Sequence, residues 1–242
     1  MTTQGDKQDD KPSGSPHLPF VTVKYAQTLD GRMATATGDS QWISGPDSLR
    51  LAHQLRAEHD AILVGVGTVL ADDPQLNVRL VGGRDPLRVI VDSRLRTPSV
   101  ARVLAGDAAR HTLIATTDMA DRDRRQEVER LGAQVVTLPT LANSSRVDLA
   151  SLLGELKARG VQSVLVEGGP AIITSLLAHK LVDRLVVAIA PKLIGSGREA
   201  VGDLGIRRLA DALTFERFST RRLGDDIIFD GRIDWRAERP AP

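Results

Sequence analysis

The sequence predicts an α/β protein in which helices flank a mostly parallel central sheet, with antiparallel strands at the C-terminal edge. Short runs of β-branched and other apolar residues recur along the chain, and segments with helical patterns separate most of them. Such alternation is typical of parallel sheets with helices on both faces. After residue 191 the alternation stops, and the last apolar run, residues 225–235, follows a segment without a long helical pattern. We therefore expect the final strands to pair in antiparallel fashion.

Most elements can be assigned individually. Seven runs are expected to be strands, beginning at Phe20, Ala61, Leu87, Thr112, Gln134, Ser163 and Arg184. Helices are predicted over residues 120–131 and 148–159, and Gly160 is placed to end the second one.

The first predicted helix covers residues 44–58. Ser44 is its expected N-cap, Pro46 stands in its first turn, and apolar residues follow at helical spacing. A helix between the first two predicted strands is the connection that a parallel pair requires.

Composition indicates an ordinary globular protein. The chain has 242 residues, of which 41% are hydrophobic and 26% charged, and we expect a single domain over residues 20–235. Residues 1–19 are polar and rich in Pro, Gly and Ser, so they are expected to form a disordered tail that lacks signal-peptide character. Residues 236–242 are expected to be a frayed end. The most apolar segment, residues 61–71, is too short to span a bilayer.

Charge balance and the lack of cysteine exclude several kinds of partner and site. The 32 Lys and Arg residues nearly balance 31 Asp and Glu residues, so a net charge of +1 gives no overall attraction to nucleic acid or anionic membranes. Without cysteine there are no disulfides, thiolate zinc sites or cysteine nucleophiles, and a cytoplasmic location is expected. The nearest histidines, His53 and His59, do not share a helix face, so no metal site is predicted.

Four loops follow predicted strands at the edge where parallel α/β folds bind ligands, outside the carboxyl ends of the strands. They are residues 27–32, 65–74, 92–96 and 167–175, and each is rich in glycine, in charged residues or in both. We therefore expect the functional site to be assembled from these loops.

The last of these loops brings Glu167, Gly168 and Gly169 to the start of a predicted helix. Backbone N–H groups and the positive helix end at such a turn form a cradle for an anion. The loop matches neither the dinucleotide fingerprint GxGxxG nor the phosphate-binding GxxxxGK motif, and a tight turn alone explains the glycines equally well. Glu167 favours a site, because a carboxylate at a strand end can hold the donors of a substrate.

Other charged residues have two explanations each. Residues 65–79 bring Thr68, Asp72 and Arg79 together, although Asp72 or the adjacent Asp73 is also a typical cap of a turn. Lys24 lies within a strand run, where it either points to solvent at a sheet edge or donates to a substrate in a cleft.

The segment GDSQWISG, residues 38–45, contains one of only two tryptophans in a chain with 3% aromatic residues. Glycine, aspartate and serine are ordinary turn residues, so Trp42 either covers the edge of the core or lines a site.

Read together, these segments resemble the reductase domain of riboflavin biosynthesis, which has a dihydrofolate-reductase-like fold. The resemblance covers residues 19–230 and rests on TLDGRMATATGDSQWIS, LRAEHDAILVGVGTVLADDPQLNVR, RVIVDSRLRTP, VEGGP and LVDRLVVAIAPKLIG, which occur in the order of that family. It implies that a ribosylaminopyrimidine 5′-phosphate is reduced to its ribitylamino product with hydride from NADPH.

The resemblance also implies site residues. Substrate contacts are implied for Ser40, Arg56, Leu76, Arg79 and Glu167. Cofactor contacts are implied for Ala26 or Gln27, Trp42, Thr68, Asp72, Ser93, Gly168, Gly169, Pro170, Ala171, Ile172, Ile173, Thr174 and Ser175. Asp72, Glu167 and Lys24 are the catalytic candidates for sugar-ring opening and proton transfer, and the sequence does not rank them. Arg94 and Arg96, beside Ser93, are expected to meet the 2′-phosphate of NADPH.

Partners follow from the same resemblance. A homodimer is expected, with residues 184–195 as an apolar surface near the C-terminal edge. Many relatives carry a zinc deaminase with HxE and PCxxC motifs, and this chain has neither, so it is expected to work beside a separate deaminase, to reduce the substrate before deamination, or to serve another pathway. A reductase of a pterin or folate and a non-catalytic nucleotide-binding protein stay open as alternatives.

Overall fold

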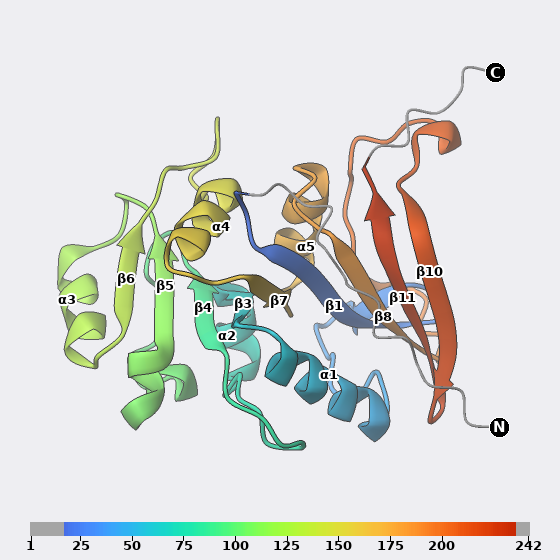
Figure 1. The fold of residues 1–242 in the computed structure, drawn as a ribbon, viewed down its shortest axis with the longest axis horizontal. Helices are drawn as coiled ribbons and strands as arrows, with labels where there is room; N and C mark the ends of the chain where they lie inside the picture. The colour runs from blue at the N-terminus through green and yellow to red at the C-terminus, as the bar shows by residue number, and fades with distance from the viewer. Residues whose placement is uncertain (1–16, 236–242) are drawn as a thin grey trace.

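The computed structural model describes residues 17–235 (Figure 1). Residues 1–16 of the predicted tail and the predicted frayed end, residues 236–242, lie outside the described residues. The end of the predicted tail belongs to the domain, because Pro19 is buried and Leu18 packs against the core. Within the described part of the chain, no helix combines the length and the apolar character needed to cross a bilayer.

Nine strands of the described residues form one sheet, and its order from edge to edge is β10, β11, β8, β1, β7, β3, β4, β5 and β6 (Figure 1). The strands are β1 (Phe20–Thr28), β3 (Ala61–Gly65), β4 (Leu87–Val91), β5 (Thr112–Thr116), β6 (Gln134–Thr137), β7 (Ser163–Val166), β8 (Arg184–Ala190), β10 (Thr214–Leu223) and β11 (Asp226–Asp234). From β8 to β6 all neighbours pair in parallel, whereas β11 is antiparallel to both β8 and β10. The predicted fold class is confirmed, and each of the seven predicted strands is present.

Helices cover both faces of this sheet. They are α1 (Pro46–Glu58), α2 (Val66–Asp72), α3 (Arg122–Arg130), α4 (Leu149–Ala158) and α5 (Pro170–Ala178), with the short 3₁₀ helices η1 (Arg102–Leu104), η2 (Gly106–His111) and η3 (Leu209–Asp211). The core beneath α4 and α5 is continuous with Val21 and Val23 of β1, whereas α1 packs on the opposite face against β7, β8 and β11. A separate small sheet pairs β2 (Arg32–Thr35) with β9 (Gly197–Glu199).

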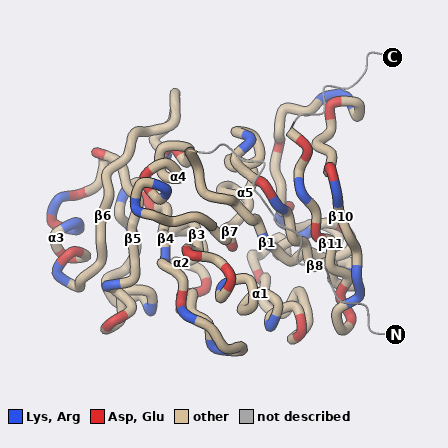
Figure 2. Tube along the Cα trace, in the orientation of Figure 1, with Lys and Arg blue, Asp and Glu red and all other residues tan. Residues whose placement is uncertain are grey.

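Charged residues of both signs are spread over the molecule, as Figure 2 shows for α3 at one end of the sheet and for the C-terminal strands at the other. The balance of charge seen in the sequence therefore also holds along the surface elements, and any anion site has to be local.

One local prediction is wrong. Ser44 is not the N-cap of α1, because the cap is Gly45, which provides no side-chain hydrogen bond. In the predicted surface of residues 184–195, β8 is paired with β1 on one side and with β11 on the other, and the exposed apolar residues are Leu193 and Ile194 beyond its end. The exposed edge at this end belongs to β10.

The alternation of side chains along β1 decides where its polar residues lie. Tyr25 is buried in the core beneath α4 and α5, whereas Ala26 packs against the cluster formed with α1. Lys24 shares the face of Ala26, because side chains two apart in a strand point the same way. β1 lies between β7 and β8, so the explanation of Lys24 as a solvent-facing edge residue is wrong.

Candidate active site

Two clefts open near the carboxyl ends of the parallel strands. The first, which we call the Trp42 cleft, has a volume of about 740 Å³. It is lined by Ala26, Met33, Ser40, Gln41, Trp42, Ile43, Ser44, Gly45, Pro46, Leu49, Asp72 and Lys192. Four of the residues predicted for the site, Ala26, Ser40, Trp42 and Asp72, thus come together in one cleft.

The segment 38–45 forms one wall of this cleft, and its backbone is bent to do so. Trp42 has a φ of 62° and its side chain is 75% exposed, so it does not serve as a cover for the core. Lys192 fixes the turn, because its Nζ donates to the carbonyl oxygen of Trp42 at 2.6 Å. An aromatic ring held out over a cleft provides a flat surface against which a planar ring can stack.

A buried charge cluster of Lys24, Arg56 and Glu167 lies on the same face of the sheet. Arg56 grips Glu167 with two bonds, from Nε to Oε1 at 3.0 Å and from Nη2 to Oε2 at 2.6 Å. The two side chains are only 9% and 14% exposed. Glu167 does not cap the following helix, because α5 has Gly169 as its N-cap and no side-chain hydrogen bond there.

Each member of the cluster has a shifted pKa. Burial lowers the pKa of the Lys24 ammonium, and the negative charge of Glu167 only partly offsets this. Burial alone would raise the pKa of Glu167, but the charge and hydrogen bonds of Arg56, together with Lys24, bring it below its ordinary value. Glu167 is therefore held ionised, while the pKa of Lys24 is brought closer to neutral pH.

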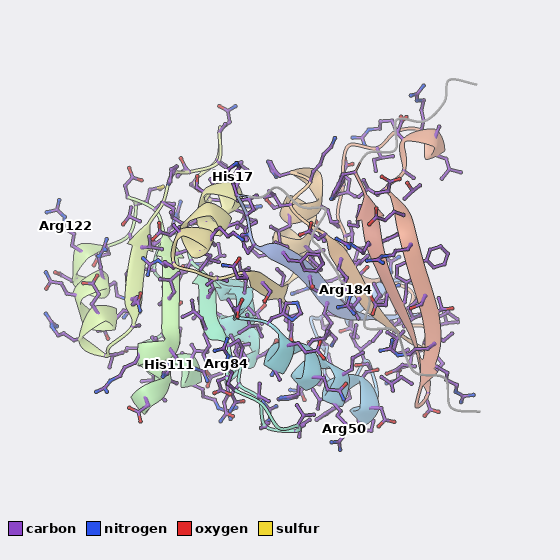
Figure 3. All side chains as sticks on the ribbon, viewed as in Figure 1. His17, Arg50, Arg84, His111, Arg122 and Arg184 are labelled. Carbon is purple, nitrogen blue, oxygen red and sulfur yellow. The ribbon has the colours of Figure 1, made fainter. Side chains whose placement is uncertain are left out.

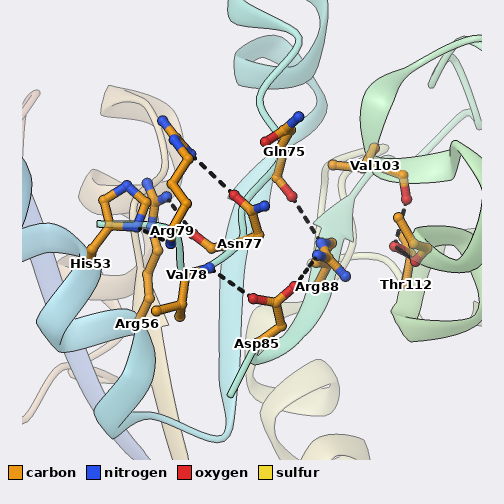
Figure 4. Close-up of polar contacts among 11 residues, drawn as sticks. His53, Arg56, Gln75, Asn77, Val78, Arg79, Asp85, Arg88, Val103 and Thr112 are labelled. Atoms are coloured by element: carbon orange, nitrogen blue, oxygen red, sulfur yellow. Dashed lines mark hydrogen bonds and ion pairs between the residues drawn. The ribbon is translucent and has the colours of Figure 1, made fainter. Parts of the chain in front are cut away.

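His53 and Arg79 lie next to Arg56 (Figure 4), and of these two His53 is buried and Arg79 exposed. The backbone N–H of Arg79 donates to His53 Nδ1 at 3.2 Å, and the guanidinium of Arg79 donates to Asn77 Oδ1 at 3.1 Å. Burial and the nearby charges of Arg56 and Arg79 lower the pKa of His53 to about 4. The ring is therefore neutral at pH 7, with its proton on Nε2.

The fork of Arg56 is already occupied, because its third donor, Nη1, bonds the carbonyl oxygen of Asn77 at 3.1 Å. Arg79 differs, since its side chain is exposed and its guanidinium donates to the neutral amide of Asn77 and not to a carboxylate. Of the two arginines predicted for the substrate, Arg79 has the more accessible charge.

The second cleft, which we call the arginine cleft, has a volume of about 520 Å³. Its polar lining consists of Ser93, Arg94, Arg96, Ser144, Ser145, Arg146 and Ser175, and its apolar lining includes Val91, Leu149 and Ile172. None of the described residues that line it is acidic. A cationic cleft without carboxylates fits a ligand that carries several phosphates.

Glycines bring α5 against this cleft. A Cβ atom on Gly168 would lie 3.0 Å from Ile172 Cβ, and one on Gly65 would lie 3.1 Å from Ile172 Cγ1. A side chain at either position would therefore push against Ile172, so close packing of α5 favours glycine at both positions. At Gly168 this agrees with the tight-turn explanation. No atom lies within 4 Å of a Cβ built on Gly169, so the start of α5 is open.

Asp92 shapes the loop that carries the arginines. Its Oδ2 accepts the backbone N–H of Thr97 at 2.7 Å and the Thr97 hydroxyl at 2.8 Å, and Leu95 between them has a φ of 54°. The hairpin that contributes Arg146 docks beside it, because the N–H of Val147 donates to Ser93 Oγ at 3.1 Å. Sequence reasoning missed Asp92, although an aspartate at the end of a strand run was the available signal.

The remaining predicted residues are dispersed. Of the adjacent residues Asp72 and Asp73, Asp73 has a structural role, because its Oδ1 accepts the N–H of Arg102 at 2.8 Å. Asp72 lines the Trp42 cleft. Gln27 lies on the other face of β1, in a separate hollow with Tyr25. Leu76 and Ile173 bury their side chains in the core, so any ligand contact would come from their backbone.

Four further predicted residues lie at α2 and α5. Thr68 of α2 lines neither of the two clefts. Thr174 and Pro170 border a smaller hollow beside Arg146, where Thr174 Oγ1 accepts the N–H of Gly202 at 2.8 Å. Ala171 lines both this hollow and the arginine cleft.

The fold and its clefts define a class: an α/β protein with one aromatic and one cationic cleft at the ligand-binding edge of a parallel sheet. Comparison with known families places the chain within this class. A model of the RibD C-terminal domain matches residues 19–229, and the chain belongs to the RibD C-terminal domain family.

Individual proteins agree with this assignment. Riboflavin biosynthesis protein RibD of Aquifex aeolicus is 40% identical over 211 residues, which cover 87% of this chain and 56% of that protein. The 2,5-diamino-6-ribosylamino-4(3H)-pyrimidinone 5′-phosphate reductase of Methanothermobacter thermautotrophicus is 43% identical over 218 residues, which cover 88% of this chain and 97% of that protein. The structure of Acinetobacter baumannii RibD, form 2, superposes with a TM-score of 0.78 at 30% identity, over 90% of this chain and 59% of that one. The chain thus spans little more than half the length of the RibD relatives.

Proposed function

We propose that this chain is an NADPH-dependent reductase that converts the ribosylamino group of a pyrimidine 5′-phosphate into a ribitylamino group in riboflavin biosynthesis. Membership of the RibD C-terminal domain family supports an oxidoreductase of this pathway, and a relative matched over 97% of its length carries the name of such a reductase. The observation that carries the proposal is the buried charge cluster of Lys24, Arg56 and Glu167, in which Lys24 lies on the same face of β1 as Ala26 of the Trp42 cleft.

The arrangement fits a nicotinamide dinucleotide phosphate across both clefts. Arg94 and Arg96 would meet its phosphates in the arginine cleft, and Trp42 and Ala26 would flank the nicotinamide. When bound, NADPH supplies the hydride that reduces the opened sugar at C1′.

The chain's own residues hold the substrate and move its protons. Glu167 is kept ionised by Arg56, so it accepts hydrogen bonds from the N–H groups of the pyrimidine and does not donate a proton. Burial lowers the pKa of Lys24, and loss of solvation raises the pKa of Asp72. Both pKa values are therefore shifted toward neutral pH. Lys24 and Asp72 are the groups suited to protonating the sugar-ring oxygen and the imine nitrogen. Arg79 binds the 5′-phosphate.

The proposal is tested by following NADPH oxidation with the purified chain. Steady oxidation is expected with the ribosylaminopyrimidine 5′-phosphate, in its deaminated or its non-deaminated form, and comparison of the two identifies the substrate. Dihydrofolate in place of this substrate should give no turnover. Turnover of dihydrofolate alone would favour the pterin or folate alternative, and NADPH binding without turnover of any of the three would favour a non-catalytic role.

We also propose that the chain acts as a cytoplasmic homodimer. The edge strand β10 supports the dimer, because Phe218 is 65% exposed there and stacks on Phe229 with ring centroids 5.5 Å apart. Light scattering at micromolar concentration should give twice the mass of one chain, and the mass of a single chain would contradict the dimer.

A further inference from the structure

The N-terminus of α1 is capped from the far end of the chain. Its own cap, Gly45, has no side chain to offer, and Pro46 follows at the first helical position. Asp226 provides the missing acceptor: its Oδ2 accepts the N–H of Gly45 at 2.8 Å and the hydroxyl of Ser48 at 2.5 Å. Asp226 is only 2% exposed and lies 181 residues from Gly45. A carboxylate at a helix N-terminus satisfies free N–H groups and the positive helix end together.

The turn that carries Asp226 fits closely against α1. β10 and β11 form a hairpin in which Leu223 pairs with Asp226, and Gly224 in the turn has a φ of 60°. A Cβ atom on Gly224 would lie 2.8 Å from Asp47 Oδ2. The hairpin turn therefore contacts the first turn of α1 at two points, through the Asp226 carboxylate and through the backbone of Gly224.

The capped residues form part of the Trp42 cleft. Gly45 and Pro46 line it next to Trp42. The segment 38–45 is attached at its beginning, where Thr35 and Asp39 bond each other, and at Trp42, whose carbonyl oxygen accepts from the exposed Lys192. Asp226 attaches the end of this segment through Gly45, and of these three attachments it is the one made by a buried carboxylate.

We propose that Asp226 is a positioning residue that holds the segment 38–45, and through it Ser40 and Trp42, in the geometry that substrate and cofactor need. Its effect on turnover rests on the proposed reductase function, whereas its effect on Trp42 does not. A purely structural cap would stabilise α1 without changing the motion of Trp42. The two roles therefore differ in a measurable property of one side chain.

The test uses the emission anisotropy of Trp42 in the full chain. Trp235 is the second of the two tryptophans, so Trp235→Phe leaves Trp42 as the single emitter and serves as the reference. In this background Asp226→Ala should lower the anisotropy of Trp42 and reduce kcat/KM about tenfold, because loss of the cap frees one end of the segment. Asp226→Asn keeps an oxygen acceptor and should restore most of both properties. Ser48→Ala removes only the hydroxyl bond and should change the anisotropy little.

Asp183 offers a matched control. Its Oδ2 accepts the backbone N–H of Val21 at 2.8 Å, at the opposite end of β1 and β8. Asp183→Ala should lower Tm as Asp226→Ala does, but leave the anisotropy of Trp42 at the reference value. Unchanged anisotropy in both Asp226 variants would overturn the proposal. If Asp226→Ala does not fold, Gly224→Ala, which pushes the turn away from Asp47, replaces it with the same expected fall in anisotropy. Absence of turnover in the reference protein would count against the proposed function, and the anisotropy would still decide the role of Asp226.

Discussion

The buried charge cluster and the arginine cleft hold charge in opposite ways. In the cluster, Arg56 and Glu167 are nearly inaccessible and bond each other through two short contacts. In the arginine cleft, Arg94, Arg96 and Arg146 are exposed, and among the described residues no acidic side chain lines that cleft. Positive charge is neutralised within the protein in the first region and left for a ligand in the second.

The two arrangements have different consequences: the buried pair fixes the positions of side chains, whereas the exposed arginines attract a ligand. A buried ion pair contributes little net stability, but it fixes two side chains in one geometry and becomes costly when one partner is removed. Exposed arginines cost little when unpaired and gain bonds when an anion binds. Substitutions in the cluster should therefore affect both stability and chemistry, and substitutions in the arginine cleft should affect ligand affinity alone.

The largest effect is expected for Glu167→Gln. It should lower kcat/KM by about a hundredfold or more while NADPH affinity changes less than about twofold, since the carboxylate holds the substrate and not the cofactor. It should also lower the free energy of unfolding by about 3 kcal/mol, because Arg56 is left buried without its counter-charge. Kinetics, NADPH titration and urea unfolding on one preparation provide the three values.

A double variant separates the two consequences. Arg56→Met combined with Glu167→Met should regain most of the lost stability but none of the activity, as apolar replacements of buried pairs are tolerated. Glu155→Gln, at an exposed pair with Arg159 on α4, is the matched control and should behave like the wild type. Near-normal kcat/KM in Glu167→Gln would refute the assignment of Glu167 to the substrate.

The next effect concerns pH and His53. Its pKa is lowered from 6.5 to about 4 in the folded protein, so between these values the unfolded chain binds a proton that the folded chain does not. The contribution of neutral His53 to the free energy of unfolding is fully present above pH 6.5 and is lost as the pH falls. Between pH 7 and pH 5 the free energy of unfolding should decrease by about 2 kcal/mol for this reason.

His53→Asn keeps an acceptor for the N–H of Arg79 and should flatten this part of the pH dependence of unfolding. His111→Asn, at an exposed ring just before β5 (Figure 3), is the control variant. Equal slopes for His53→Asn and the wild type in urea unfolding at pH 5 and pH 7 would contradict the assignment.

An effect of about tenfold is expected in the arginine cleft. Arg94→Ala with Arg96→Ala should reduce the preference for NADPH over NADH about tenfold or more, because the charge-assisted bonds to the 2′-phosphate are lost. The Tm should stay within about 1 °C of the wild type, since neither side chain is buried.

Arg122→Ala is the control for this pair, because Arg122 is exposed, projects outward from α3 (Figure 3) and does not line the arginine cleft. Titration with both dinucleotides measures the preference. An unchanged ratio of the two affinities would remove Arg94 and Arg96 from cofactor recognition.

The smallest effect is expected for Arg79→Ala. Loss of a charge that binds the remote 5′-phosphate equally in ground and transition states should raise KM about fivefold and leave kcat nearly constant. Arg84→Ala, at an exposed pair with Asp60, is the comparison. A fall in kcat with unchanged KM would indicate that Arg79 acts in the chemical step instead.

Local sequence patterns predicted the strands, because buried parallel strands leave apolar runs that are visible without any knowledge of contacts. Three of the four predicted loops contribute to the two clefts, whereas residues 27–32 line a separate hollow. The pairing of Arg56 with Glu167 spans 111 positions and depends on sheet order, which no local pattern contains. The same reason explains the failure at Ser44, since the acceptor that caps α1 arrives with Asp226 from the end of the chain. Lys24 and Gln27 were placed only when the register of β1 fixed which side chains share a face.

Transfer of deuterium from NADPH labelled at nicotinamide C4 tests the central claim most directly. A single turnover with the ribosylaminopyrimidine 5′-phosphate should give a ribitylamino product that contains one deuterium, located at C1′, and the Glu167→Gln protein should form this product at least about a hundredfold more slowly. Product without deuterium, or consumption of labelled NADPH without ribitylamino product, would contradict the account.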